Sequence, residues 1–435
     1  MDRRSGRQRN RQLNAEYSPQ LREAIQALID EGARIDINKG GRYWYPLSIA
    51  TYGMEEIVAA VELLCSFRTT MWSKTRLFEQ RFTGVSGTPE AVMVNSGSSA
   101  DLLIAFAAVN PQRRLLSPGD EVLVPSVTWP TQIWSAMMAG LRVRFVDTDP
   151  RTLNIDLDDL RRKIGPATRA VFLVHLMGNP NDMDTVEEIR DRHDLLLFED
   201  CCEALGSSFK GRPVGSFGTA SAFSFFFSHH LTTMEGGMVC TDDPELSDLF
   251  RLLRAHGWAR NTRYAVPSQV EPGLDPRYTF LNWGFNVRPT ELQAAFGVEQ
   301  LARLPEFAAA RRRNVEKAKD LFQRHSDFLR LMEIHPAAEC SWFALPIMLT
   351  SDCPFSKAEF LAHLESRGIE TRPIVAGNLA RQPVCQFFPE LQGMDLPGAD
   401  AVHDRGFYMG LYPVDSGEQL DRVAETFDEF IRAHA

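Results

Sequence analysis

Between residues 90 and 245, short apolar runs alternate with segments that are long enough to form helices. Apolar runs of this kind predict strands, and the segments between them predict crossover helices. The alternation therefore indicates βαβ units and a mostly parallel sheet, which places the chain in the α/β class. The first five predicted strands span residues 91–94, 121–124, 143–146, 170–174 and 195–198.

The rest of the chain predicts further helices and a smaller α/β unit. Helical spacing of apolar residues is the main evidence for these elements. The expected helices span residues 21–31, 54–64, 290–322, 357–366 and 417–432, with a strand at 343–348. We expect three parts, namely an N-terminal extension (1–45), a large domain (46–300) and a small C-terminal domain (301–435).

Composition excludes several classes of function. The net charge of −10 argues against binding to nucleic acid or to an anionic membrane surface. No apolar run approaches the roughly 18 residues that a membrane span needs, and no apolar stretch of a secretory signal follows the basic start of the chain. The seven cysteines are scattered, odd in number and without metal-ligand spacing, which predicts no metal site and reduced thiols in a cytoplasmic protein.

The first predicted strand leads into a turn of small residues, Asn95 to Ser99, and then into a helical stretch. A helix that begins at such a turn presents free N–H groups and the positive end of its dipole, which suit a phosphate. The hydroxyls of Ser98 and Ser99 add donors. The alternative is an ordinary helix cap.

Asp200 follows the apolar run of the fifth predicted strand. In open α/β sheets, ligands gather at the carboxyl ends of the strands. A carboxylate there can keep the nitrogen of a pyridine ring protonated, which turns the ring into an electron sink. The alternative is a turn residue or a helix cap.

A further strand-like run ends at Ser224, and His229 stands five residues later. Residues 225–227 are all phenylalanine and are expected to pack in the core. Glu235 then begins a Glu-Gly-Gly turn, which leads into a predicted strand at 238–241. No lysine occurs between Lys210 and Lys317, so the sequence near this segment offers no amine to anchor a cofactor.

Together these motifs resemble the sugar aminotransferases of the DegT/DnrJ/EryC1/StrS family, which are pyridoxal-phosphate (PLP) enzymes of fold type I, the aspartate-aminotransferase-like fold. The resemblance runs from about residue 46 to the C-terminus. Within the family, Ser-His-His at 228–230 followed by Thr-Met-Glu-Gly-Gly at 233–237 resembles the nucleotide-sugar 3-dehydratases, which carry histidine in place of the anchoring lysine. Segments 254–261, 286–289 and 372–378 resemble the corresponding segments of one group of these dehydratases, which act on GDP-4-keto-6-deoxymannose in colitose synthesis.

The resemblance implies a role for each matching residue. His229 becomes the catalytic base, and His230 is expected to be structural. Trp129 stacks on the pyridine ring, Glu203 lies near the ring substituents, and Asn286 reaches the phosphate from a neighbouring subunit, which implies a homodimer. The implied cofactor-binding residues are Gly97, Ser98, Ser99, Trp129, Asp200, Glu203, Ser224 and Asn286. The implied substrate contacts are His256, Arg260, Arg288 and Arg372, since arginine can grip a diphosphate bidentately; a surface ion pair or a helix-end charge is the alternative for each.

The implied function is that of a lyase. PMP and PLP would be bound without a covalent link, the C3 hydroxyl of a nucleotide 4-keto-6-deoxyhexose would be removed, and L-glutamate would regenerate PMP. A related dehydrase carries an iron–sulfur cluster, but residues 258–286 contain no cysteine to supply its four ligands. The alternatives are an aminotransferase of nucleotide 4-keto sugars and a non-catalytic relative. The product would enter an O-antigen or a secondary metabolite.

Overall fold

The computed structural model describes residues 19–31, 42–263 and 273–434 of the 435-residue chain. Residues 1–18 and 32–41 of the expected N-terminal extension lie outside these ranges. A helix over residues 19–31 confirms the one expected around 21–31. Within the described residues, no helix combines the length and the apolar character that crossing a bilayer requires.

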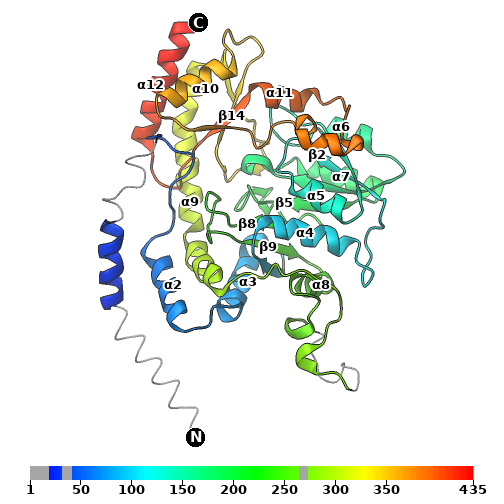
Figure 1. Cartoon of the computed structure of the whole chain (residues 1–435). Helices are drawn as coiled ribbons and strands as arrows, with labels where there is room; N and C mark the ends of the chain where they lie inside the picture. The colour runs from blue at the N-terminus through cyan, green and yellow to red at the C-terminus, as the bar shows by residue number, and fades with distance from the viewer. Residues whose placement is uncertain (1–18, 32–41, 264–272, 435) are drawn as a thin grey trace.

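A seven-stranded sheet forms the centre of the molecule, in the order β1-β9-β8-β5-β4-β2-β3 (Figure 1). The five neighbouring strands β8, β5, β4, β2 and β3 run parallel to one another, as predicted. Strand β9 is antiparallel to both of its neighbours, β1 and β8. The five predicted strands are each present within two residues of the expected bounds. The strands of this sheet are β1 (Glu90–Val94), β2 (Glu121–Pro125), β3 (Arg142–Val146), β4 (Thr168–Val174), β5 (Leu196–Asp200), β8 (Ala220–Ser224) and β9 (Gly237–Thr241).

Helices cover both faces of this sheet because side chains of successive strand residues point to opposite sides. Val122 and Val124 pack in the cluster beneath α4, whereas Leu123 packs in a second cluster with residues of α6 and α7. The helices around the sheet are α2 (Met54–Cys65), α3 (Ser73–Ser86), α4 (Gly97–Ala108), α5 (Thr131–Met138), α6 (Leu157–Lys163), α7 (Met183–His193) and α8 (Pro244–Arg254).

The long helix α9 (Glu291–Arg324) connects this layer structure with the C-terminal part of the chain. It begins at a capping box in which Thr290 accepts from the N–H of Gln293. A four-stranded antiparallel sheet follows, in the order β10-β12-β14-β13. The predicted boundary at 300/301 falls inside α9, and the division into domains stays a prediction.

The C-terminal elements confirm the helices expected at 357–366 and 417–432 and the strand expected at 343–348. Several short elements were not predicted, since strands of two to four residues carry too little apolar pattern. The remaining elements are β10 (Leu329–Leu331), β12 (Leu345–Leu349), α10 (Lys357–Ser366), β13 (Thr371–Pro373), α11 (Pro397–Arg405), β14 (Gly406–Met409) and α12 (Gly417–His434). A small sheet contains β6 (Ser208–Phe209), β7 (Arg212–Pro213) and β11 (Ala338–Glu339). Short 3-10 helices are η1 (Leu176–Gly178), η2 (Ala259–Asn261), η4 (Pro276–Tyr278), η5 (Leu379–Arg381), η6 (Pro383–Phe387) and η7 (Pro389–Leu391).

Candidate active site

A cavity of about 490 Å³ lies at the carboxyl ends of β4, β5 and β8. Ligands gather at this edge in open α/β sheets. The N-terminus of α4 borders it on one side, and residues of β13 and β14 close it on the other. Eight of the predicted site residues line it, namely Gly97, Ser98, Trp129, Asp200, Glu203, Ser224, His229 and Arg372.

One end of the cavity is the turn before α4. Ser96 caps the helix by accepting from the N–H of Ser99, whose hydroxyl donates to Asn95 Oδ1 at 2.6 Å. Ser99 is therefore buried in the cap, whereas Ser98 faces the cavity beside Thr131. The alternative of an ordinary cap holds for Ser99 and not for Ser98.

Gly97 allows α4 to approach β8 closely. A Cβ at this position would lie 2.6 Å from the Cβ of Ser224 and 2.9 Å from the sulfur of Cys202. Only glycine therefore brings the N-terminus of α4 and the hydroxyl of Ser224 to one point. The result is a small cradle of N–H and O–H donors at a helix N-terminus, which suits a phosphate.

The carboxylate of Asp200 lines the same cavity, where it is buried and held by two donors. The N–H of Cys202 donates to Oδ1 at 2.8 Å, and the amide of Gln132 donates to Oδ2. Burial raises the pKa of Asp200, and the bond from Cys202 partly offsets this rise. The sequence analysis did not predict Gln132. Its position shortly after β2, a strand that ends at the same sheet edge as β5, could have indicated that it lies near Asp200.

His229 also lines this cavity, and its tautomer follows from its hydrogen bond. Nδ1 is 2.7 Å from the backbone oxygen of Cys202, which can only accept. Nδ1 therefore carries the proton, and Nε2 is the free basic nitrogen of the neutral ring. Burial, with a smaller contribution from the positive charge of Arg311, lowers the pKa of His229 to about 4.

Aromatic rings fix the orientation of His229. Phe343 and Phe226 meet the imidazole edge to face, with ring centroids 5.0 and 6.1 Å away. The expectation that all three phenylalanines of residues 225–227 pack in the core is wrong for two of them. Only Phe225 is buried, whereas Phe226, which lines the cavity, and Phe227 are exposed, because the chain leaves the strand at Ser224.

His230 points away from the cavity and is buried. Its Nε2 lies 2.9 Å from the backbone oxygen of Ser341, and burial lowers its pKa well below the usual range. This position agrees with the structural role expected for it.

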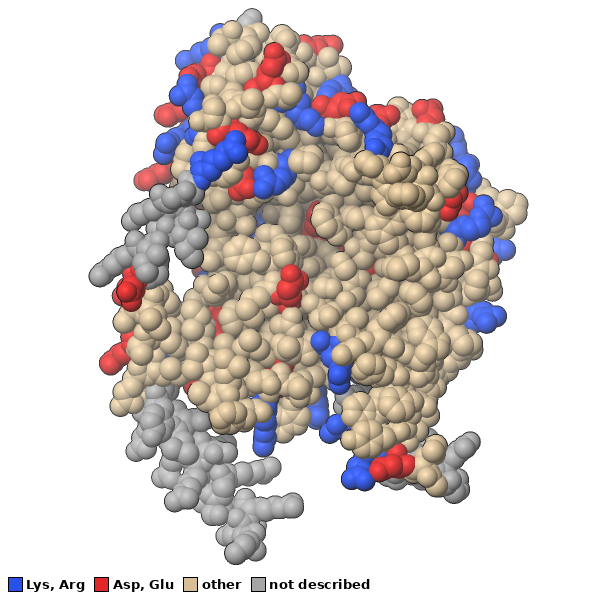
Figure 2. All heavy atoms as spheres, viewed as in Figure 1, with Lys and Arg blue, Asp and Glu red and all other residues tan. Residues whose placement is uncertain are grey.

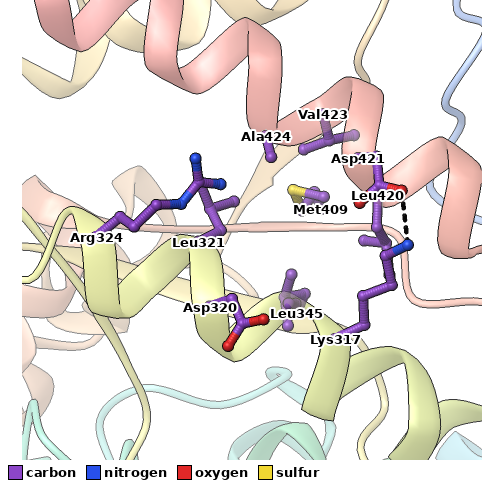
Figure 3. Close-up of a pocket in the computed structure, with 11 residues that line it drawn as sticks. Lys317, Asp320, Leu321, Arg324, Leu345, Met409, Leu420, Asp421, Val423 and Ala424 are labelled. Atoms are coloured by element: carbon purple, nitrogen blue, oxygen red, sulfur yellow. Dashed lines mark hydrogen bonds and ion pairs between the residues drawn. The ribbon is translucent and has the colours of Figure 1, made fainter.

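None of the residues that line the cavity is a lysine. Lys317, the next lysine in sequence after Lys210, lies in a separate hollow of about 360 Å³ between α9 and α12. Its Nζ forms an ion pair with Asp421 at 2.6 Å, and Figure 3 marks this pair with a dashed line. Lys317 therefore takes no part in the cavity that holds His229.

Glu203 and Arg372 contribute the remaining charges of the cavity. Burial raises the pKa of Glu203 to about 7, although its carboxylate accepts from the N–H of Met177 at 2.9 Å. Arg372 lies on β13 with a half-exposed side chain and bonds Glu370 at 2.7 Å. Arg372 can therefore reach solvent and a ligand at the cavity mouth.

Besides Ser99, four of the predicted residues lie outside the cavity. Asn286 is exposed and accepts from Arg288 Nε at 2.9 Å, and the Arg260 guanidinium lies over the Trp258 ring at 5.2 Å. His256 is also exposed. This subunit does not bring these four side chains to its own cavity, and their contacts with cofactor or substrate stay predictions.

The buried cluster of His175, Glu199 and Cys201 has the donor types of a metal site. However, Glu199 accepts from the N–H groups of Gly215, Phe217 and Gly218 and lies 3.1 Å from His175. Its lone pairs are therefore used to hold the loop before β8.

Comparison with known proteins identifies relatives over most of the chain. The profile of the DegT/DnrJ/EryC1/StrS aminotransferase family matches residues 50–428. The GDP-4-keto-6-deoxy-D-mannose 3-dehydratase of Yersinia pseudotuberculosis is 38% identical over 383 residues, which are 87% of this chain and 97% of that protein.

Solved structures give the same result. The E. coli GDP-4-keto-6-deoxy-D-mannose-3-dehydratase with bound hydrated PLP superposes with a TM-score of 0.83 at 35% identity, covering 88% of this chain and 99% of that one. A GDP-4-keto-6-deoxymannose-3-dehydratase with a trapped PLP-glutamate geminal diamine gives the same TM-score, identity and coverage. These similarities confirm the aspartate-aminotransferase-like α/β fold expected from the sequence.

Proposed function

The chain belongs to the DegT/DnrJ/EryC1/StrS aminotransferase family, and we propose that it is a 3-dehydratase of a nucleotide 4-keto-6-deoxyhexose, with GDP-4-keto-6-deoxymannose favoured. The observation that carries this proposal is His229, a neutral imidazole with a free Nε2 in a cavity whose lining residues include no lysine. The names of the relatives at 35–38% identity support the same activity.

The residues of the cavity fit PMP and PLP. When bound, this cofactor supplies an amine for the substrate ketone and a protonated ring that accepts electrons. The cradle formed by Gly97, Ser98 and Ser224 would hold its phosphate. Asp200 would bind the protonated ring nitrogen, and Trp129 would cover a ring face. Glu203 would contact the ring substituents.

His229 performs the proton transfers in this proposal. Because the pKa of His229 lies well below cellular pH, its imidazole is neutral in the cell and its Nε2 can accept a proton. The same Nε2–H can then donate to the departing C3 hydroxyl, which leaves as water. A lysine here would instead capture the cofactor covalently and favour an aminated product.

Further partners follow from the family relationship. L-glutamate would restore PMP, in line with the relative whose structure holds PLP and glutamate. A homodimer is supported by the broad face of the molecule on which few charged residues lie (Figure 2), and by the exposed aromatic side chains of Tyr278, Phe280 and Trp283. In such a dimer, Asn286 would reach the partner's phosphate site. We propose a cytoplasmic enzyme whose deoxysugar product is a precursor of colitose, which is then incorporated into an O-antigen.

The test is incubation of the purified protein with PLP, L-glutamate and a panel of nucleotide 4-keto-6-deoxy sugars. A 4-keto-3,6-dideoxy sugar and free ammonia, identified by mass spectrometry and an ammonia assay, support dehydration. An amino sugar formed in proportion to glutamate would instead identify an aminotransferase. A protein that binds no cofactor would be a non-catalytic relative.

A further inference from the structure

Asp101 is a buried acid that the reaction described above does not use. It lies on α4 and is only 1% exposed, yet its side chain lines the cavity. Residues four apart lie on the same face of a helix. Asp101 therefore stands one turn beyond Gly97, on the side of α4 that faces Cys202 and Ser224.

The hydrogen bonds of Asp101 and Asp200 differ. Both oxygens of Asp200 accept, one from the N–H of Cys202 and one from Gln132. Oδ1 of Asp101 is buried without a hydrogen-bond partner in the described structure. An ionised carboxylate without donors costs more in a buried site than a neutral acid does. The donors thus stabilise the charge on Asp200, and nothing comparable stabilises a charge on Asp101.

The titratable groups that face Asp101 strengthen this difference. From β5 and the turn after it come Asp200 and the thiols of Cys201 and Cys202. From α5, the uncharged Gln132 bonds Asp200, and the arginines of α8 bind Glu79 and Glu90. Burial, followed by the charge of Asp200, raises the pKa of Asp101 well above its usual value. Two nearby carboxyl groups of this kind share one proton.

We propose that Asp101 is the protonated member of a carboxyl pair with Asp200 and acts as a positioning residue for the cofactor ring. By holding the shared proton, Asp101 leaves Asp200 as the single ionised group at this end of the cavity. Asp200 is then free to bind a protonated ring nitrogen. This inference rests on the proposed function for the identity of the ring, but the protonation of Asp101 belongs to the protein alone.

The first test therefore uses the cofactor-free protein. Melting temperatures of the wild type, Asp101→Asn and Asp101→Ser are measured from pH 4 to pH 9. A raised pKa in the folded state means that the wild type loses stability as pH rises above the ordinary value of about 3.9. Both neutral variants lack this loss, so their advantage over the wild type should grow with pH and reach about 2–4 °C near pH 8.

Asp159 provides a matched control on α6. It is also buried, but Lys163 binds it at 2.7 Å. Although burial alone would raise the pKa of Asp159, the hydrogen bonds from Lys163 and from the N–H of Asp147 lower it. Asp159→Asn should therefore melt below the wild type at pH 8. If Asp101→Asn and Asp101→Ser also melt below the wild type there, with no gain as pH rises, the proposal is overturned.

The second test separates positioning from packing in the loaded protein. Asp101→Asn keeps a neutral donor of the same shape, whereas Asp101→Leu keeps only the volume. We expect Asp101→Asn to bind PMP within about threefold of the wild type at pH 7.5, and Asp101→Leu to bind at least tenfold more weakly. Equal binding of PMP by the two variants, or a tenfold loss in Asp101→Asn, contradicts a neutral donor at this position. Failure of dehydration in all proteins, with these binding results intact, would fault the proposed reaction and not the role of Asp101.

Discussion

The backbone oxygen of Cys202 accepts a hydrogen bond from Nδ1 of His229 at 2.7 Å, which leaves Nε2 as the basic nitrogen. The same residue donates its own N–H to Asp200. A single turn after β5 thus orients both the imidazole and the buried carboxylate. The proposed base and the carboxylate proposed to bind the ring nitrogen are therefore positioned by one short piece of backbone.

Replacement of His229 by asparagine should abolish dehydration and leave cofactor binding intact. The amide keeps a donor for the oxygen of Cys202 but supplies no base, and loss of a general base costs about 10²- to 10⁴-fold in rate. Product formation and PMP binding by absorbance are the two measurements. His230→Asn is the control, because it should lower the melting temperature and retain most of the activity of the folded protein. A His229→Asn variant with near-normal turnover would show that another group is the base.

Replacement of His229 by lysine should restore a covalent link to the cofactor. An amine placed five residues after Ser224 can react with the aldehyde of PLP, which borohydride reduction makes permanent. Mass spectrometry should then show the added cofactor on the peptide that contains residue 229, and dehydration should be lost. The wild type treated in the same way should show no such adduct. Absence of the adduct from the variant would mean that residue 229 does not face the cofactor.

The depressed pKa of His229 has consequences for pH dependence. Because this pKa is about 4 in the folded protein and about 6.5 in the unfolded chain, the unfolded chain binds the proton first as pH falls. The contribution to stability is therefore complete above pH 6.5 and is lost as pH falls toward 4. His230 behaves in the same direction. Between pH 7 and 4, the stability of His229→Asn should fall less steeply than that of the wild type, and an identical slope would contradict a half-buried, neutral His229.

The sequence predicts the elements of the site better than their contacts. Asp200, Ser224 and His229 each follow a recognisable strand, so their place at one sheet edge could be inferred. Gln132 reaches Asp200 from α5, and Phe343 reaches the cavity from the loop before β12. Such contacts depend on how distant segments pack, and no local pattern encodes that packing.

The sheet shows the same limit. Each predicted strand exists, but the insertion of β9 in antiparallel orientation between β1 and β8 depends on pairing between segments that lie far apart in the sequence. The turn over residues 235–237 marks only where β9 begins. Exposure of Phe226 and Phe227 was missed for a related reason, because an apolar run does not show where a strand ends and a loop begins.

Removal of the amide of Gln132 should weaken the site through Asp200. Gln132→Leu leaves one carboxylate oxygen without its donor, and an unsatisfied buried acceptor costs about 1–3 kcal/mol. We expect weaker PMP binding and a dehydration rate reduced about tenfold. Gln132→Glu should be more damaging than Gln132→Leu, since it adds a third carboxyl group next to Asp200 and Asp101. The reverse order of the two variants in a PMP titration would argue against an ionised Asp200.

The close approach of α4 and β8 can be tested at Gly97. In Gly97→Ala, the new methyl group would lie 2.6 Å from the Cβ of Ser224, so the strand or the helix must shift and the phosphate cradle must open. PMP binding should weaken by at least tenfold. Gly84→Ala on α3 is the control, because its Cβ would meet nothing within 4 Å and alanine favours a helix by about 1 kcal/mol. The double variant Gly97→Ala with Ser224→Gly removes the closest contact and leaves the one with the sulfur of Cys202 at 2.9 Å. It should recover part of the stability lost in Gly97→Ala but not the PMP binding, since the hydroxyl of Ser224 is also gone. Full recovery of both properties would mean that the hydroxyl of Ser224 does not contribute to PMP binding. The N-terminus of α4 would then hold the phosphate without it.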